Sequence, residues 1–409
     1  MFGVLTKITI TQVSTTQYPN RTKFFEFDFC VSTEVSSTWA HLTDTATVVL
    51  PRAIYFVDST GAKTTWADTQ IYGNPEKAPL ILRGDKIKIE TGYSFFKPTG
   101  GQGFNRKETV TKMRVVFDGY ITKIKNKTPI ELVCEDSMYA LKQTKVESKE
   151  YNSSQYTLEA MLKEMIGKSD FPDARQIVVK TDNYKHNIGN FITQNVTVAQ
   201  VLDELRKSYH LESFIRKTYN EDNSLKSTEL RCGIIRYYPE DRESHQFHFQ
   251  KTIISDNLEY TRADDIRIGI KAFSINKVEL ASVNSSGKNK LKKTRLETTV
   301  GDLDGELRTL FFTEIDSVEE LKRQALVKLP FLKYEGFRGS FTTFGLPKVK
   351  HGDEVRLIDD KLPERNGTYL VKDVKEVNSG SGQRQIITLD IRIDGLTADE
   401  LKEFQSNGA

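Results

Sequence analysis

A strand motif that occurs twice is the strongest constraint on how this chain folds. Residues 82–89 contain a Gly-Asp pair followed by alternating charged and aliphatic residues, and residues 350–357 repeat this order. Each copy precedes a second strand that also repeats, at 118–124 and at 366–372. Because a repeated order of elements implies a repeated fold, the sequence predicts two similar β domains.

The two copies differ in spacing. Gly84 and Gly119 lie further apart than Gly352 and Gly367, which predicts an insertion of about 20 residues in the first copy. We place this insertion at 95–112, where a cluster of glycines indicates a loop. An alternative is that the Gly-Asp and Asn-Gly pairs recur by chance, since both are common in the turns of β proteins.

Length and hydrophobicity narrow the class of protein. The chain has 409 residues, which at about 150 residues per domain predicts two to four domains. Only 37% of the residues are hydrophobic, and no apolar run approaches the roughly 18 residues of a membrane span. The first residues also lack the pattern of a signal peptide. We therefore expect neither membrane insertion nor secretion.

Charge and cysteine content exclude two further classes. The formal net charge of +3 is too small for the basic stripe that duplex DNA binding requires. The cysteines Cys30, Cys134 and Cys232 are widely spaced in apparent strands, with no close pair for a disulfide framework or a zinc site. They are predicted to be buried thiols in a reducing compartment.

Alternating apolar and polar residues predict an antiparallel sheet in residues 1–145. The alternation is clearest at 25–29 and at 85–90. Glycine-containing stretches at 58–61 and 98–103 predict turns, the second of them in an exposed loop.

Helical spacing takes over in residues 146–250, which are predicted to form an α/β insertion. One apolar stripe covers 158–166 behind the N-cap residue Thr157. A second stripe ends at Tyr209 and follows a capping box made by Thr197 and Gln200.

Strands return at 251–300 and at 337–395. The polar, lysine-rich stretch 284–290 is predicted to be a hairpin tip or flexible loop. Residues 301–336 are predicted to be an insertion with one helix, which begins at a capping box of Ser317 and Glu320 and ends at Pro330. A short helix is expected within 396–409.

The ordered set of these segments resembles the tail or baseplate hub proteins of bacteriophages and the hub half of contractile injection and type VI secretion spike proteins. No single motif is specific, and the likeness rests on the series as a whole. The segments that carry it are 117–121, 134–141, 198–205, 256–260, 345–357 and 366–393.

The resemblance implies a mainly β fold with α/β insertions. Two similar β-barrel tube domains per chain, at 1–145 and at 251–300 with 337–395, would assemble as a trimer into a pseudo-sixfold ring. Residues 146–250 and 301–336 would be insertions, and 396–409 a C-terminal tail. Such a trimer adapts a sixfold tail tube to a threefold spike, because each chain contributes two equivalent domains.

The resemblance also implies the partners and the location. The tail tube or a distal tail protein would lie above the trimer, and a separate spike or tip protein below it. Tape-measure protein and DNA would pass through the lumen without specific binding. The protein would be made in the host bacterial cytoplasm and reside in the virion, at the tail baseplate or tail tip. The alternative function is a tail-associated cell-wall hydrolase or a receptor-binding tail protein.

Candidate metal and phosphate sites are weak. His245 and His248 form a His-x-x-His pattern, but residues three apart on a strand point to opposite faces, which disfavours joint ligation. The Gly287-Lys288 pair lacks the upstream glycine and the strand-to-helix context of a phosphate loop. No metal and no cofactor is predicted.

Candidate catalytic residues are equally weak. The pairs Asp264-Asp265 and Asp359-Asp360 suggest the acid and base of a glycosidase, but paired aspartates in turns are commonly solvent-facing. The basic run 288–293 is either a solvated loop or a contact with nucleic acid or a neighbouring subunit. No catalytic residue is assigned, and the chain is predicted not to be an enzyme.

Overall fold

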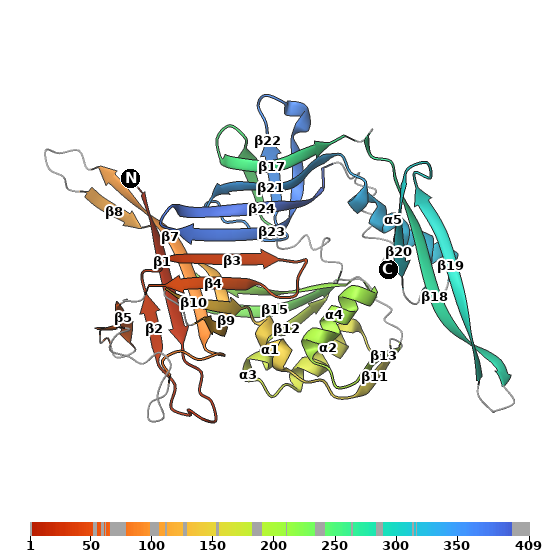
Figure 1. Ribbon diagram of the computed structural model, residues 1–409, viewed down its shortest axis with the longest axis horizontal. Helices are drawn as coiled ribbons and strands as arrows, with labels where there is room; N and C mark the ends of the chain where they lie inside the picture. The colour runs from red at the N-terminus through yellow and green to blue at the C-terminus, as the bar shows by residue number, and fades with distance from the viewer. Residues whose placement is uncertain are drawn as a thin grey trace.

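The protein is described by a computed structural model that covers residues 2–394, apart from 52–54, 59–60, 62, 66–78, 99–105, 111–112, 126–128, 153–154, 182–189, 210, 234–241, 263–264, 284–288, 313–314 and 316. Strands hold 53% of the structure and helices 16%, so the predicted mainly β fold is confirmed. One large sheet runs through the upper and left parts of the molecule in Figure 1, with a helical region below it and a long hairpin at the right.

Residues 2–135 form the first half of the large sheet. Neighbouring strands pair antiparallel throughout, as predicted from the alternating pattern. Alternate residues such as Ile8, Ile10, Ile87 and Ile89 are buried in one core. The strands are β1 (Phe2–Thr11), β2 (Phe24–Phe27), β3 (Ser32–Thr38), β4 (Thr45–Leu50), β5 (Tyr55–Asp58), β6 (Lys63–Thr65), β7 (Lys86–Pro98), β8 (Arg106–Val110), β9 (Arg114–Lys125) and β10 (Ile130–Glu135).

Six later strands form the second half of the same sheet. Phe247, Phe341, Val355 and Tyr369 lie in its separate core. Its elements are β16 (Ser244–His248), β17 (Ile253–Thr261), β21 (Gly336–Phe344), β22 (Glu354–Ile358), the 3-10 helix η4 (Pro363–Arg365), β23 (Gly367–Ser379) and β24 (Gly382–Arg392).

The two halves repeat the same order of strands. Neighbours run β3-β4-β10-β9-β7-β1 in the first half and β17-β21-β24-β23-β22-β16 in the second. We call Gly84-Asp85, just before β7, and Gly352-Asp353, just before β22, the Gly-Asp corners. The register agrees there, because Gly84 N donates to the Ile121 carbonyl at 2.7 Å and Gly352 N donates to the Val371 carbonyl at 2.8 Å. One difference is that β1 pairs antiparallel with β7, whereas β16 pairs parallel with β22.

The predicted match of Gly119 with Gly367 is wrong by two residues. Gly119 lies opposite Ile87, whereas Gly367 lies opposite Leu357, one pleat further along the strand. The equivalent of Gly119 is therefore Tyr369. Backbone hydrogen bonds at the corners set the register of β9 against β7 and of β23 against β22. Backbone groups are the same in every residue, so the two similar strand sequences do not reveal this register. The predicted insertion between β7 and β9 contains β8, which pairs with β7.

The two halves are continuous rather than separate. Strand β23 of the second half pairs antiparallel with β3 of the first half, from Asp373 opposite Thr38 to Ser379 opposite Ser32. We call this contact the internal joint. Among the residues that the structure describes, no strand pairing closes either half into a barrel.

Residues 138–233 form an α/β module beneath the first half (Figure 1). The predicted caps are present: Thr157 Oγ1 accepts from Ala160 N at 3.2 Å, and Thr197 N donates to Gln200 Oε1 at 2.8 Å. Two short helices, α1 and α3, were not predicted. The elements are α1 (Met138–Gln143), β11 (Lys149–Asn152), α2 (Leu158–Gly167), α3 (Pro172–Arg175), β12 (Val178–Thr181), β13 (Asn190–Thr193), α4 (Val198–Tyr209), β14 (Glu212–Tyr219) and β15 (Leu225–Gly233).

A hairpin module extends from the second half at the right of Figure 1. It consists of β18 (Ile268–Val283), β19 (Asn289–Gly301), β20 (Glu306–Phe312) and α5 (Val318–Leu332), whose apolar residues form their own core. Part of the segment 251–300 that was predicted for the second β domain therefore lies in a different sheet, and β16, which precedes it, lies in the large sheet.

Pro330 does not end helix α5, which continues to Leu332. Proline removes one backbone donor, but the extra residues place Leu332 against the core of the hairpin module. The predicted terminal helix and most of the two loops at 98–103 and 284–290 lie outside the described residues.

Candidate functional site

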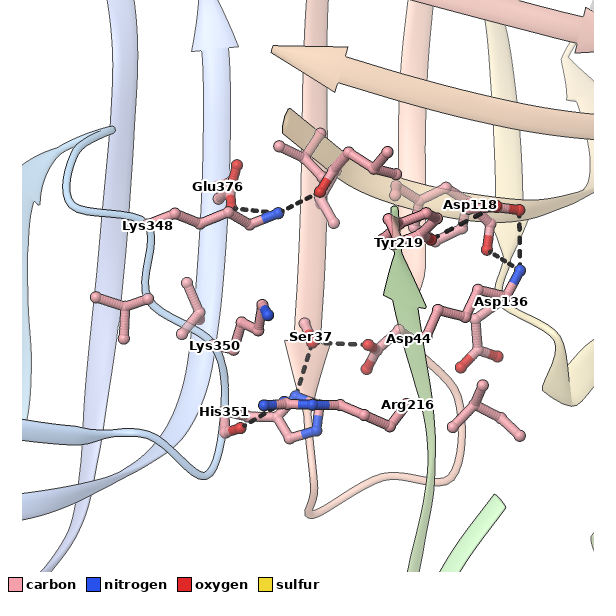
Figure 2. A pocket seen from close by; sticks show the side chains of 18 residues that line it. Ser37, Asp44, Asp118, Asp136, Arg216, Tyr219, Lys348, Lys350, His351 and Glu376 are labelled. Carbon is pink, nitrogen blue, oxygen red and sulfur yellow. Dashed lines mark hydrogen bonds and ion pairs between the residues drawn. The ribbon is translucent and has the colours of Figure 1, made fainter. Parts of the chain in front are cut away.

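A cavity of about 110 Å³ lies where the two halves and the α/β module meet. Strands β3, β9, β14 and β23 and the loop before β22 line it. Figure 2 shows charged side chains that reach it from all three regions, among them Asp44, Arg216, Lys348 and Glu376. We call it the junction site, because polar groups from distant parts of the sequence are brought together there.

The Ser37 hydroxyl links the two halves at this site. It donates to Asp44 Oδ2 at 2.7 Å and lies 2.8 Å from His351 Nδ1 (Figure 2). Thr38 N donates to the other oxygen of Asp44 at 3.0 Å. The ring of Phe214, from the α/β module, packs edge-on against the ring of His351 with 4.7 Å between centroids. All three regions therefore contact one hydrogen-bonded group.

Burial decides the charges of this group. It lowers the pKa of His351 to about 3, helped by the nearby positive charges of Arg216 and Lys350, so the imidazole is neutral at pH 7. Burial raises the pKa of Asp44 to about 6 and that of the neighbouring Asp136 well above its usual range. The negative charge of Asp44 contributes to the raised pKa of Asp136, because like charges disfavour a second ionisation.

A serine, a histidine and a carboxylate raise the question of a hydrolase. In a catalytic triad the histidine lies between the serine and the carboxylate and takes the proton of the serine. Here Ser37 lies in the middle and donates to Asp44, so the neutral His351 donates its Nδ1 proton to Ser37. Within the described chain, His351 Nε2 has no hydrogen-bond partner. The arrangement is a structural hydrogen-bond chain and does not activate Ser37.

A second buried contact crosses between the halves. Lys348 Nζ donates to the Val115 carbonyl at 2.6 Å and lies 3.8 Å from the Glu376 carboxylate. The Lys348 and Glu376 side chains are only 13% and 10% exposed. Burial lowers the pKa of Lys348 and raises that of Glu376, because each charge loses hydration.

Adjacent residues of β14 attach the α/β module to both halves. Lys217 Nζ donates to the carbonyl and to the carboxylate of Asp118, both at 2.9 Å, in the first half. Arg216 donates to the His351 carbonyl at 3.3 Å and lies 3.8 Å from the Asp353 carboxylate, in the second half. Because neighbouring residues on a strand point to opposite sides, one strand spans the junction.

The structure separates the two predicted histidines. His245 Nε2 lies 3.5 Å from the Asp353 carboxylate, beside the junction site. The backbone N–H of His248 donates to Thr252 Oγ1 in the turn that follows β16. In the described part of the chain, no group of three or more His, Cys, Asp and Glu side chains is placed to hold a metal.

The predicted aspartate pairs are not brought together. Asp265 and Asp360 are exposed, and Asp264 lies outside the described residues. Asp359 Oδ1 accepts from Lys361 N at 2.9 Å and from Gln250 Nε2 at 2.6 Å, which is turn chemistry.

The remaining predictions concern the basic run and the cysteines. Lys290, Lys292 and Lys293 belong to strand β19 rather than to a loop, and Gly287-Lys288 lies outside the described residues. All three cysteines are free thiols. Cys134 and Cys232 are buried in strands, whereas Cys30 is half-buried between β2 and β3.

Sequence reasoning missed the junction site itself. Its one signal is a polar residue at an inward position of an alternating strand: Glu376 lies on the same face of β23 as the buried Val374. Its partner Lys348 and its neighbours Ser37 and Arg216 are distant in sequence. Nothing local marks them as a group.

Two solved structures share this fold. The tail protein from Neisseria meningitidis MC58 matches with a TM-score of 0.58 and 14% identity, over 98% of this chain and 99% of that chain. The 43 kDa tail protein of prophage MuSo2 from Shewanella oneidensis matches with a TM-score of 0.53 and 10% identity, over 95% of this chain and 98% of that chain. No family model and no curated protein matched the sequence.

The fold is therefore that of phage tail proteins, which confirms the resemblance predicted from the sequence. None of the helices described is long and apolar enough to cross a membrane.

Proposed function

We propose that the chain is a structural hub at the tip of a phage tail tube, and that three copies form an adapter between a sixfold tube and a threefold spike. The repeated strand order of the two halves carries this proposal. Each chain has two similar halves, so a trimer presents six similar sets of strands to a sixfold tube. Each chain has one copy of each insertion, so the same trimer has only threefold symmetry toward a spike. The match to phage tail proteins over nearly the whole chain supports the same role.

We propose the predicted division into domains with two adjustments. The predicted tube domains are 1–145 and 251–300 with 337–395, and the predicted insertions are 146–250 and 301–336, with 396–409 as a tail. The sheet pairings favour moving β16 into the second tube domain and moving β18 and β19 into the second insertion.

The partners follow from this role. The tube or a distal tail protein would bind one face of the ring and a separate spike or tip protein the other. Tape-measure protein and DNA would pass through a neutral or acidic lumen, since a cationic wall would hold phosphates in a salt-dependent manner. We place the α/β module outside the ring, because helices α2 and α4 each bury only one face.

The mass of the particle in solution tests the proposal. Analytical ultracentrifugation of the full chain should give a species of about 140 kDa, three times the 46.7 kDa of one chain. The purified protein should not cleave peptidoglycan. A monomer at every concentration contradicts the trimer, and cleavage of peptidoglycan would favour the hydrolase instead.

Single substitutions separate the two functions. Asp265→Asn, Asp359→Asn, Asp360→Asn, His245→Ala and His248→Ala should leave tail assembly and infectivity intact, because a structural hub needs no catalytic side chain. A variant that assembles normal tails but loses a peptidoglycan-cleaving activity present in the parent would overturn the structural function.

A further inference from the structure

The internal joint pairs an edge of each half. The pairing between β23 and β22 ends at the second Gly-Asp corner, where Val371 N donates to the Asp353 carbonyl at 2.9 Å. From Asp373 onward, the same edge of β23 pairs with β3 instead of with β22. Lys375 and Glu34 form an ion pair of 2.7 Å across the joint.

The same two edges recur without partners. Strand β17 corresponds to β3 and ends the large sheet, because among the described residues its one neighbour is β21. Strand β9 corresponds to β23, and Ile121 N donates to the Asp85 carbonyl at 2.8 Å as Val371 does to Asp353. Beyond this corner β9 no longer pairs with β7, so its edge from Lys123 to Lys125 is uncovered in the part of the chain described.

We propose that β17 of one copy pairs antiparallel with the end of β9 of the next copy, which repeats the internal joint between chains. The repeat sets the register: because Asp373 lies opposite Thr38 and Lys375 opposite Ser36, Lys123 should lie opposite the second copy's Thr261 and Lys125 opposite its Glu259. This inference rests on the proposed function, since a closed ring of three chains would alternate three internal and three intermolecular joints.

Charge favours this pairing. Lys125 and Glu259 are opposite charges that would face each other directly, in place of the diagonal Lys375–Glu34 pair of the internal joint. Lys125 forms an ion pair with Glu131 of its own chain, and its side chain is still 42% exposed, so it remains accessible to Glu259 of a second copy. The two strands therefore match in register and in charge.

Burial separates the paired edge from the unpaired one. On β3 the inward positions are buried, and Thr33 is 3% exposed. On β17 the equivalent of Thr33 is Asp256, which is exposed, and so is Glu259, which the proposed register places opposite Lys125. An exposed edge strand is a template for pairing with another chain. A second copy is the occupant that supplies a strand end of the required kind, because β9 has the register of β23.

Disulfide cross-linking tests the register. Lys123→Cys with Thr261→Cys should form intermolecular disulfides under mild oxidation, since directly opposite residues of antiparallel strands lie within bonding reach. Lys123→Cys with Asn257→Cys is the matched control, displaced by about 13 Å along the strand. Ser36→Cys with Lys375→Cys spans the internal joint and should close within one chain, without covalent oligomers.

A charge exchange gives an independent measurement. Glu259→Lys places a lysine opposite Lys125 at each of the three joints between chains. If each joint is weakened about fivefold, the trimer becomes about a hundredfold less stable. Lys125→Glu together with Glu259→Lys should restore most of the loss. Glu150→Lys makes the same charge change at an exposed site on β11 and should leave trimerisation unchanged.

The outcomes separate this inference from the proposed function. A trimer of about 140 kDa that cross-links at 123 and 261, but not at 123 and 257, supports both. A trimer that cross-links at neither pair and tolerates Glu259→Lys overturns the joint and leaves the trimeric hub standing. A monomer at every concentration overturns the ring and, with it, the joint.

Discussion

The two Gly-Asp corners have the same backbone and different charge partners. Asp85 accepts from both terminal nitrogens of Arg21, at 2.7 Å and 2.6 Å, and the two side chains are 1% and 3% exposed. Its counterpart Asp353 lies 3.8 Å from Arg216 and 3.5 Å from His245, and its Oδ1 makes no hydrogen bond within the described chain.

The two aspartates differ because their arginine partners come from different regions of the chain. Arg21 belongs to the long connection between β1 and β2, within the first half itself. The corresponding connection between β16 and β17 spans only 249–252, so this connection is too short to supply an equivalent arginine. Asp353 instead faces Arg216 of the α/β module. The first corner is closed within its own half, whereas the second depends on an insertion for its cation.

Loss of Arg21 should have the largest effect. Arg21→Met removes the bidentate partner of Asp85 and leaves a buried carboxylate unpaired, which costs about 3–5 kcal/mol. Thermal and urea unfolding monitored by circular dichroism measure the loss. Arg216→Met is the matched substitution at the second corner and should cost less, about 1–2 kcal/mol, because its contacts are longer. Equal losses would contradict the contrast between the corners.

The pH dependence of stability should come from the second corner. His351 has a folded pKa of about 3 against an ordinary 6.5, so below pH 6.5 the unfolded chain binds a proton that the folded chain does not. Stability is therefore lost as the pH falls, by about 2 kcal/mol between pH 6.5 and 5. Asp44, with its raised pKa of about 6, and Asp136, whose pKa is also raised, act in the opposite direction, because each holds its proton more tightly in the folded chain.

His351→Gln should abolish the loss of stability at acid pH that the histidine causes. It should leave the gain in stability that comes from Asp44. Unfolding midpoints measured from pH 7 to pH 5 in parent and variant give the difference. The residue at the equivalent position of the first corner is Arg83, which is exposed, so Arg83→Gln is the control and should keep the slope of the parent. An unchanged slope in His351→Gln would show that burial of this imidazole does not control the pH response.

The smallest effect tests what the corners share. Gly84 and Gly352 have φ angles of +93° and +84°, a region that side chains with a Cβ rarely adopt. Gly84→Ala and Gly352→Ala should each cost about 1 kcal/mol of unfolding free energy. Gly380→Ala, at a glycine with open space around its Cβ position, should be close to neutral. Strongly unequal losses at the two corners would show that their backbones are not equivalent.

Much of the local structure was predictable from the sequence. The alternation at 85–90 predicts β7, and the caps at Thr157 and Thr197 predict the starts of α2 and α4, because these signals lie within a few residues of the element they specify. The repeat at 82–89 and 350–357 predicts two related strand sets for the same reason. The register error at Gly119 marks where local signals end, since corner hydrogen bonds decided it.

The sequence by itself determined that this chain is mainly β, that a strand motif occurs twice, and where its main helices begin. Only the tertiary structure decided that the two strand sets join through β3 and β23, and that Arg21 and Arg216 face the two equivalent aspartates. The physical reason is distance along the chain. Hydrophobic period and capping act between neighbours, whereas buried charges find partners from segments that only the folded backbone brings together.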